Sequence, residues 1–388
     1  MTHKKLSHLT IEQVKTLINR YNNTNEKVAD LLKEYEIEAN PSELVSLFPQ
    51  QVHTDLLCTF CDETSMISKP EPRSKLYQNR TPYCPKCSHK ACSTCFCENC
   101  RKLNISISLK EEKSQKRVIE KEFTYSIAPH SIDQITLKDA VYLIALMNHS
   151  LTEDLKFVEP FNSNESKYAP HFQLQDKATK YLYGRGFIKI SAESPIDAFL
   201  FNEDITCTVS YSPTEVLWDF LPSLDLRDKK IFLKNIQEKA RNDQWPESWH
   251  ADTDKFWRQI AKYECIEYYD CLLRERNYNL TSIGDKTHTT FETLIEIFPI
   301  SKIYNIIWGA IVTTNDFNHT MKMPHHRGKN NFIGAVMKRA ERALAQEWEL
   351  KHYRRGYNCQ QSAISSTFFN LFLGVGDRYF ETIPPKLS

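Results

Sequence analysis

Glycine is scarce in this chain, and long apolar runs are missing. Only 9 of its 388 residues are glycine, and neither G-x-x-x-x-G-K-[ST] nor G-x-G-x-x-G occurs, the glycine-rich loops that hold phosphates in nucleotide-binding enzymes. Because no run of about eighteen apolar residues is present, we expect no transmembrane helix and no membrane partner. The opening MTHKKLSHLT lacks the apolar core of a signal peptide. These absences predict a cytoplasmic protein without glycine-rich phosphate-binding loops.

Charge is nearly balanced, and hydrophobic residues are plentiful. The 50 Lys and Arg residues oppose 49 Asp and Glu, and 41% of the chain is hydrophobic. Such a chain can bury a substantial core and should form about two or three domains. Since the formal net charge is only +1, contact with nucleic acid would depend on local basic patches.

Eight of the twelve cysteines are concentrated in one short stretch. They occur, with His89 among them, as Cys58-x-x-Cys61, Cys84-x-x-Cys87 and Cys92-x-x-Cys95-x-Cys97-x-x-Cys100. A Cys-x-x-Cys pair places both sulfurs on one side of a tight turn, and two such turns close a tetrahedral shell around Zn²⁺. The alternative, a disulfide cluster, would need an oxidising compartment. We therefore predict one or two zinc ions.

The run TPYCPKCSHK over residues 81–90 resembles the second knuckle of a zinc ribbon. In a sequential arrangement the first ion takes Cys58, Cys61, Cys84 and Cys87, and the second takes Cys92, Cys95, Cys97 and Cys100, with His89 as a substitute ligand. In a nested arrangement, Cys58, Cys61, Cys97 and Cys100 would form an outer site and Cys84, Cys87, Cys92 and Cys95 an inner one. We favour the sequential one because its first site follows ribbon spacing. Four protein ligands leave no position for a substrate, so the expected role is structural.

Three short amphipathic segments precede the cysteines. Apolar residues recur at helical spacing over 11–21 and 26–35, Thr10 is a suitable N-cap for the first, and Asn40 with Glu43 marks the start of a third. Short helices joined by a tight turn resemble a helix-turn-helix, which we assign to residues 1–50. The third helix carries no Arg or Lys, so DNA reading and docking of a protein both remain open.

Basic residues surround the cysteines. Residues 64–102 contain eight Lys or Arg against two Glu, with Tyr77, Tyr83 and Phe96 among them. Rings beside cations suit stacking on bases and contact with phosphates, although a solvated surface around a structural metal is the alternative. The nucleic-acid contacts predicted in this segment are Arg73, Lys75, Arg80, Lys86 and Lys90.

A second basic segment covers residues 322–355, with nine Lys or Arg against three Glu. We expect Lys338, Arg339 and Arg342 to lie on the solvated face of a helix over 331–347. Arginine and histidine suit phosphate geometry. The phosphate contacts predicted here are the loop His325-His326-Arg327 together with Arg354 and Arg355.

The remaining segments complete a mainly helical fold. A zinc-binding ribbon over 51–102 is followed by a linker or hairpin arm over 103–135, which contains a strand-like stretch at 105–109. Residues 136–212 resemble a winged helix, with a hairpin in which 187–191 pairs with 205–211; a plain α+β segment is the alternative. From 213 to 388 we expect a large helical domain, with helices over about 213–221, 228–241, 253–276, 288–297, 301–314, 331–347 and 360–373.

These modules together predict a zinc-containing DNA-binding protein with a regulatory or accessory role. Bacterial mobile elements and antiviral, phage-defence systems use similar modular proteins, which is analogy of architecture alone. The alternative is a zinc-stabilised scaffold that binds a protein partner. A metal-assisted nuclease could use Asp316, His319, His325 and His326. No H-E-x-x-H, Walker or kinase signature supports an enzyme, so we predict no catalytic residue.

Overall fold

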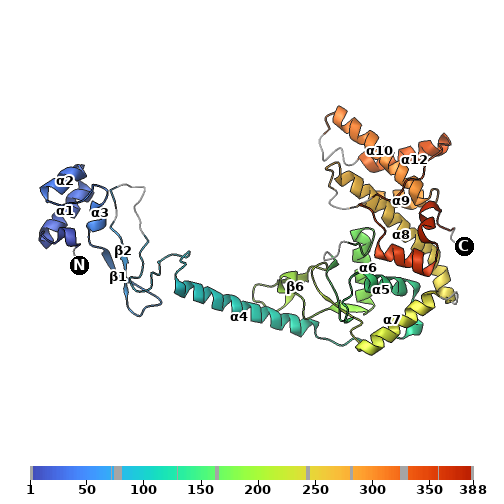
Figure 1. The fold of residues 1–388 in the computed structure, drawn as a ribbon, viewed down its shortest axis with the longest axis horizontal. Helices are drawn as coiled ribbons and strands as arrows, with labels where there is room; N and C mark the ends of the chain where they lie inside the picture. The colour runs from blue at the N-terminus through green and yellow to red at the C-terminus, as the bar shows by residue number, and fades with distance from the viewer. Residues whose placement is uncertain are drawn as a thin grey trace. The chain divides into compact units, whose positions relative to one another are not determined.

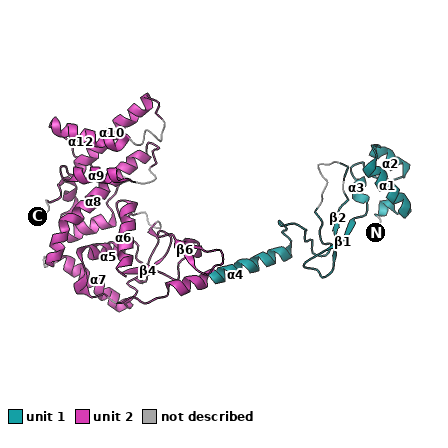
Figure 2. Ribbon diagram, turned by 180° about the vertical axis from the view of Figure 1, so that it is seen from behind, with its two compact units in different colours: residues 1–114 teal, residues 115–388 magenta. Residues whose placement is uncertain are grey.

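The structure is a computed structural model of the 388-residue chain. It describes residues 3–70, 72–73, 81–128, 130–161, 166–241, 245–279, 283–323, 331–356 and 358–385. The chain divides into two compact units, residues 1–114 and 115–388 (Figure 2). Each unit contains its own hydrophobic core.

Unit 1 opens with short helices (Figure 1): a 3-10 turn Lys4–Leu6, then α1 (Ile11–Asn23), α2 (Val28–Glu34) and α3 (Leu44–Leu47). The predicted cap of α1 is confirmed, because the Thr10 side chain accepts a hydrogen bond from the Gln13 N–H and the Gln13 side chain accepts one from the Thr10 N–H. Buried leucines of all three helices form the core of the module. The described part of α3 is only four residues long.

Two antiparallel strands follow, β1 (Gln51–Leu57) and β2 (Ser65–Ser68), joined by the turn that carries Cys58 and Cys61. Tyr83 forms bridges with Ile67 of β2 and with Lys90. The chain that carries the second cysteine pair therefore returns beside the same strands.

A single long helix, α4 (Glu98–Phe123), occupies the predicted linker. The strand expected at 105–109 is wrong, because these residues lie inside α4. Alternating Ile and Ser have no sheet to join there, and the sequence on their C-terminal side is rich in Lys, Glu and Arg, which favour helix. As a result Ile105 and Leu109 remain 53% and 52% exposed.

The strands of unit 2 pair differently from the prediction. The strands β3 (Phe157–Val158), β4 (Ile188–Ile190) and β7 (Trp218–Phe220) form one antiparallel sheet in the order β3-β7-β4, and β5 (Phe199–Phe201) pairs with β6 (Thr208–Tyr211). The expected pairing of 187–191 with 205–211 and the expected helix over 213–221 are therefore wrong. In both β4 and β7 the first and third residues are buried, whereas Val209 of β6 is 67% exposed. Strands whose buried faces match pair with one another.

Helices form most of unit 2. They are α5 (Leu137–His149), α6 (Phe172–Gly184), α7 (Leu226–Arg241), α8 (Glu247–Arg274), α9 (Asp285–Ile295), α10 (Ile300–Thr320), α12 (Asn331–Ala345) and α13 (Ala363–Ser366), with a π-helical turn Thr367–Phe372 and 3-10 turns Ile132–Gln134, Ile196–Ala198 and Gly376–Glu381. Residues Leu137–Leu146 of α5 lie mainly in the core. In the described part of the chain, no helix combines the length and apolar character needed to cross a bilayer.

Candidate metal centres

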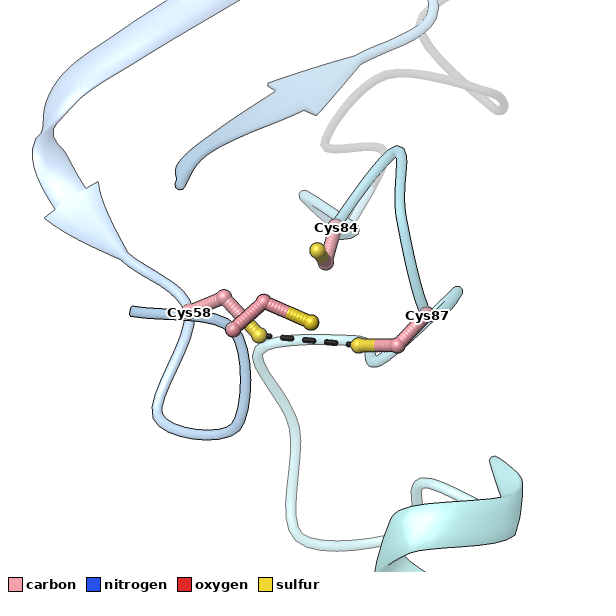
Figure 3. Close-up of side chains that lie close together, drawn as sticks. Cys58, Cys84 and Cys87 are labelled. Carbon is pink, nitrogen blue, oxygen red and sulfur yellow. Dashed lines mark hydrogen bonds between the residues drawn. The ribbon is translucent and has the colours of Figure 1, made fainter. Parts of the chain in front are cut away.

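Four cysteine sulfurs converge at the end of the β1–β2 hairpin. The Sγ atoms of Cys58, Cys61, Cys84 and Cys87 all lie within 4.8 Å of one another, and those of Cys58 and Cys87 are 3.6 Å apart (Figure 3). Tetrahedral zinc with Zn–S bonds of about 2.3 Å separates its sulfurs by about 3.8 Å. The four side chains therefore fit a zinc ion, and the structure brings together the first predicted ligand set.

Backbone hydrogen bonds hold both cysteine turns in place. The Cys58 N–H donates to the Thr64 carbonyl at 2.9 Å, and the Cys84 N–H donates to the His89 carbonyl at 2.7 Å. Ser88, directly after the second pair, has a positive φ of 58°, which closes the turn tightly. The sulfur positions thus depend on the local backbone.

Hydrogen bonds give these thiols different pKa values. Burial acts to raise the pKa of Cys84, but N–H groups of Cys87 and Lys86 outweigh it and lower that pKa to about 7. The pKa of Cys61 rises to about 12, chiefly because its side chain shares a hydrogen bond with Cys87. Zinc binds thiolates, so metal binding would release the remaining protons.

A second group gathers directly beyond the first. It consists of His89, Cys95, Cys97 and Cys100, whose ligand atoms also lie within 4.8 Å of one another. Nδ1 of His89 is 3.2 Å from the Cys100 Sγ and 3.8 Å from the Cys97 Sγ. This is the grouping with His89 as substitute ligand; Cys92 is exposed and stays outside it. Two nitrogen-to-sulfur distances in this range suit tetrahedral zinc with one imidazole ligand.

The second group is also held by main-chain donors. The Lys90 N–H donates to the Cys95 Sγ at 3.1 Å, and the Cys100 N–H donates to the Cys97 Sγ at 3.5 Å. The first of these bonds is the main cause that lowers the pKa of Cys95 to about 6. The His89 ring meets Phe60 edge-on at 4.9 Å between centroids, so one aromatic contact orients the imidazole.

Of the basic residues predicted to contact nucleic acid, Lys86 and Lys90 are exposed beside the two groups. Arg73 instead lies against α1. Its guanidinium donates to the carbonyls of Arg20, at 3.3 Å, and of Tyr21 and Glu26. Positive side chains are favourable at helix C-termini. The contact ties the cysteine segment to the helical module, and no local sequence signal could have revealed it, because the partners are about 50 residues away.

In the second basic segment, Arg354 is exposed but Arg355 turns inward. Its Nη2 lies 2.7 Å from Oε2 of Glu264 and also contacts the Tyr379 hydroxyl. The Arg355 side chain is 17% exposed and that of Glu264 is 0% exposed. Arg355 thus neutralises a buried carboxylate. The predicted residues that lie outside the described part of the chain are Lys75, Arg80, His325, His326 and Arg327.

Comparisons with known proteins add one short likeness. Over 53 residues, 14% of this chain, the sequence is 45% identical to "Uncharacterized protein RC0786" of Rickettsia conorii (strain ATCC VR-613 / Malish 7). The match covers 64% of that relative, which is less than two thirds of its length. No protein-family model and no solved structure matches the chain.

Proposed function

We propose that this chain is a zinc-containing nucleic-acid-binding protein that contacts DNA through unit 1. The observation that carries the proposal is the pair of adjacent Cys/His groups joined by one turn, in which Cys87 belongs to the first and His89 to the second. Zinc in these closed sites would supply folding energy rather than catalysis. The zinc-held turn displays Lys86 and Lys90 to solvent, where they can reach phosphates.

An aromatic side chain supports the same surface. Phe96 is 90% exposed and stands between Cys95 and Cys97, two of the candidate ligands. Metal ligands on both sides would hold the backbone of Phe96 in place, so little backbone entropy would be lost when a base stacks on the ring. The helical module, which Arg73 holds to this segment, would extend the contact in the manner of a helix-turn-helix.

The test is the salt dependence of DNA binding by the full chain. Replacing Lys86 and Lys90 with Ala should flatten the plot of log affinity against log salt by about 0.9 for each phosphate that is no longer neutralised, hence by about two units for the pair. Lys230→Ala with Lys234→Ala, two exposed positions on α7, is the matched control. Wild-type affinity and slope in the Lys86/Lys90 variant would contradict the proposal.

A protein-interaction scaffold is the second candidate. Four apolar side chains of α4, Leu103, Ile105, Ile107 and Leu109, are each about half exposed, at 47%, 53%, 52% and 52%. On a helix these positions form two stripes on opposite sides, Leu103 with Ile107 and Ile105 with Leu109, and exposed apolar side chains are frequent where other proteins bind. If the chain binds no nucleic acid at low salt, this part of α4 becomes the leading site for a partner.

A further inference from the structure

An arginine of α12 lies over the backbone of a mid-helix glycine of α10. A Cβ atom built on Gly309 would sit only 2.4 Å from Cζ of Arg339, so the guanidinium occupies the space that any other residue would fill. Beyond it, the ring centroid of Trp348 lies 5.3 Å from the same Cζ. Glycine inside a helix weakens the helix, and here its missing side chain leaves room for the guanidinium of Arg339.

Among the described residues, this cation packs against Trp348 and pairs with no carboxylate. The sequence predicts a solvated Arg339, whereas the side chain is half-buried, and its buried Nε has no hydrogen-bond partner among the described residues. Arg355, by contrast, is paired with Glu264. A buried N–H without an acceptor is costly, and an acceptor from a bound ligand would remove that cost.

Trp348 lies against this arginine, Trp308 directly precedes Gly309 on α10, and both rings remain in contact with water. Trp308, next to Gly309, is 42% exposed and Trp348 is 38% exposed, whereas Trp218, Trp249 and Trp257 are at most 7% exposed. The Tyr353 ring lies 6.1 Å from that of Trp308, and the Trp348 indole N–H donates to the Gln346 side chain at 2.9 Å. The rings are thus held in place without being covered.

Cations continue this surface along α10. The segment 351–354 is fixed there because Asn305 donates to the Lys351 carbonyl at 3.1 Å and the Tyr353 N–H donates to the Ser301 carbonyl at 3.0 Å. Lys351 and Arg354 are exposed on either side of Tyr353. Residues 338–354 carry five Lys or Arg against three Glu, a local charge of +2. A polyanion fits this balance better than a polycation does.

We propose that Trp308, Arg339 and Trp348, with Lys351 and Arg354, form a binding surface for single-stranded nucleic acid in unit 2. Unpaired bases stack on the exposed indole rings, Arg339 meets a phosphate or base edge beside Trp348, and the outer cations follow the backbone. Two exposed rings favour bases over an acidic peptide, which has nothing to stack. The surface goes beyond the contact proposed for unit 1 and does not depend on it.

Tryptophan fluorescence of the full, zinc-loaded chain tests this surface directly, because all six tryptophans lie in residues 115–388. Oligo(dT) and oligo(U) should quench the emission at low salt. Trp308→Ala should remove part of the quenching and weaken binding about fivefold to a hundredfold. Phe317→Ala, which removes another exposed ring of α10 (50% exposed), is the matched control and should bind as wild type does.

Gly309→Ala is the decisive variant. The three atoms nearest its new methyl group all belong to the guanidinium of Arg339, the far end of a flexible side chain that can move aside. Since alanine is also the better helix former, thermal stability should not fall. It should nevertheless weaken oligonucleotide binding at least about fivefold, because the methyl group displaces the guanidinium of Arg339 from its position over Gly309 while the charge of the chain is unchanged. A role of Gly309 in packing alone would alter stability and leave binding intact.

Three outcomes would overturn the assignment. The first is wild-type protein whose tryptophan emission is not quenched by oligonucleotides. The second is that the Gly309→Ala and Trp308→Ala variants bind oligonucleotides as wild type does. The third is that poly-glutamate competes with oligo(dT) at equal charge and binds these two variants more weakly than wild type. The last would assign the surface to an acidic protein. The Lys86→Ala/Lys90→Ala variant separates this surface from the unit 1 contact. Its binding to duplex DNA in a gel shift should weaken, while oligonucleotides should still quench its tryptophan emission.

Discussion

Of His89 and Cys92, only His89 belongs to the second candidate metal centre. The imidazole Nδ1 lies 3.2 Å from the Cys100 Sγ, while Cys92 is exposed and receives only a weak hydrogen bond from Thr94 at 3.7 Å. Four cysteines within nine residues would crowd a tetrahedral shell, and a histidine from the preceding turn relieves that crowding. The choice is open to a stoichiometry measurement.

Cys92→Ser should retain two zinc ions per chain, whereas Cys95→Ser should retain one, because only Cys95 belongs to the converging group. Elemental analysis of gently purified, reduced protein measures this count. Cys207→Ser, an exposed cysteine of unit 2, controls for the removal of a thiol in itself. A Cys92→Ser protein with one zinc would return Cys92 to the ligand set.

Burial shapes the titration of His171 in unit 2. The residue is 4% exposed, and burial, followed by the charges of Arg274 and His288, lowers its pKa to about 4. Nδ1 accepts a hydrogen bond from the Gln173 N–H at 3.3 Å, while Nε2 lies 3.9 Å from Oδ2 of Asp270. The imidazole is therefore neutral in the folded chain at pH 7.

Acid should destabilise unit 2 through this residue. Unfolded histidine has a pKa of about 6.5, so between pH 6.5 and 4 the unfolded chain binds the extra proton and stability falls by up to about 1.4 kcal/mol per pH unit. His171→Asn keeps an acceptor for the N-cap of α6 and does not titrate, so its stability should fall less. Urea unfolding followed by tryptophan fluorescence at pH 6.5 and 5 compares the two proteins.

Glu267 acts in the opposite direction over an overlapping range. Burial raises the pKa of its carboxyl to about 8, against the lowering effect of Lys167. The folded chain then keeps a proton that the unfolded chain loses, and this contribution to stability disappears as pH rises from about 4.5 towards 8. Because Glu267 is present in both proteins, an identical pH slope for wild type and His171→Asn would rule out the role of His171.

At the scale of elements, α4 is the unusual one. It has 26 residues, but only Val118 and Ile119 of it are buried. A helix without packing depends on its own backbone hydrogen bonds, and the Ser108 hydroxyl adds one to the Asn104 carbonyl at 3.1 Å. The N-terminal part of α4 is therefore the place where a helix-breaking substitution should have a local effect.

Ser108→Pro should open α4 without unfolding either core. Proline removes a backbone hydrogen bond and clashes with the preceding turn, at a cost of about 3 kcal/mol. Trypsin should then cut early at the basic residues of 101–117 and release two stable fragments, one carrying the zinc and one carrying the tryptophans. Ser106→Ala is the control. Resistance to trypsin in the proline variant, or fragments that precipitate, would count against independent units.

At the scale of the whole molecule, metal should control one core and not the other. The candidate ligands all lie in residues 58–100, within unit 1, and the core of unit 2 is built from residues 119–380. Structural zinc contributes its binding energy to the folding of its own unit. Chelation should therefore unfold the cysteine segment of unit 1 and leave the core of unit 2 intact.

A strong chelator such as EDTA or TPEN, added in excess, should reduce far-ultraviolet circular dichroism slightly and expose the cysteines of unit 1 to a thiol reagent. The urea midpoint followed by tryptophan fluorescence should stay the same, because all six tryptophans belong to unit 2. Restoring zinc should reverse both changes. A midpoint that falls on chelation would show that the stability of unit 2 depends on the metal.

The sequence by itself determined the local interactions. The Cys-x-x-Cys turns, the Thr10 cap and most helices of unit 2 follow from residues a few positions apart. Turns, caps and amphipathic faces are decided within that range. The substitute role of His89 was also visible, since it lies six residues before Cys95, but spacing could not choose between it and Cys92.

Contacts between distant residues were decided by the tertiary structure alone. Arg73 meets carbonyls about 50 residues earlier, β4 takes β7 as its neighbour and not β6, and Arg355 turns to Glu264, 91 positions away. Each choice depends on which faces and charges must be buried together, a condition that no short window of sequence contains. The contact of Arg339 with Gly309 is of the same kind. A glycine inside a helix indicates that another group comes close to the backbone, but only the packing of α12 on α10 shows that this group is Arg339.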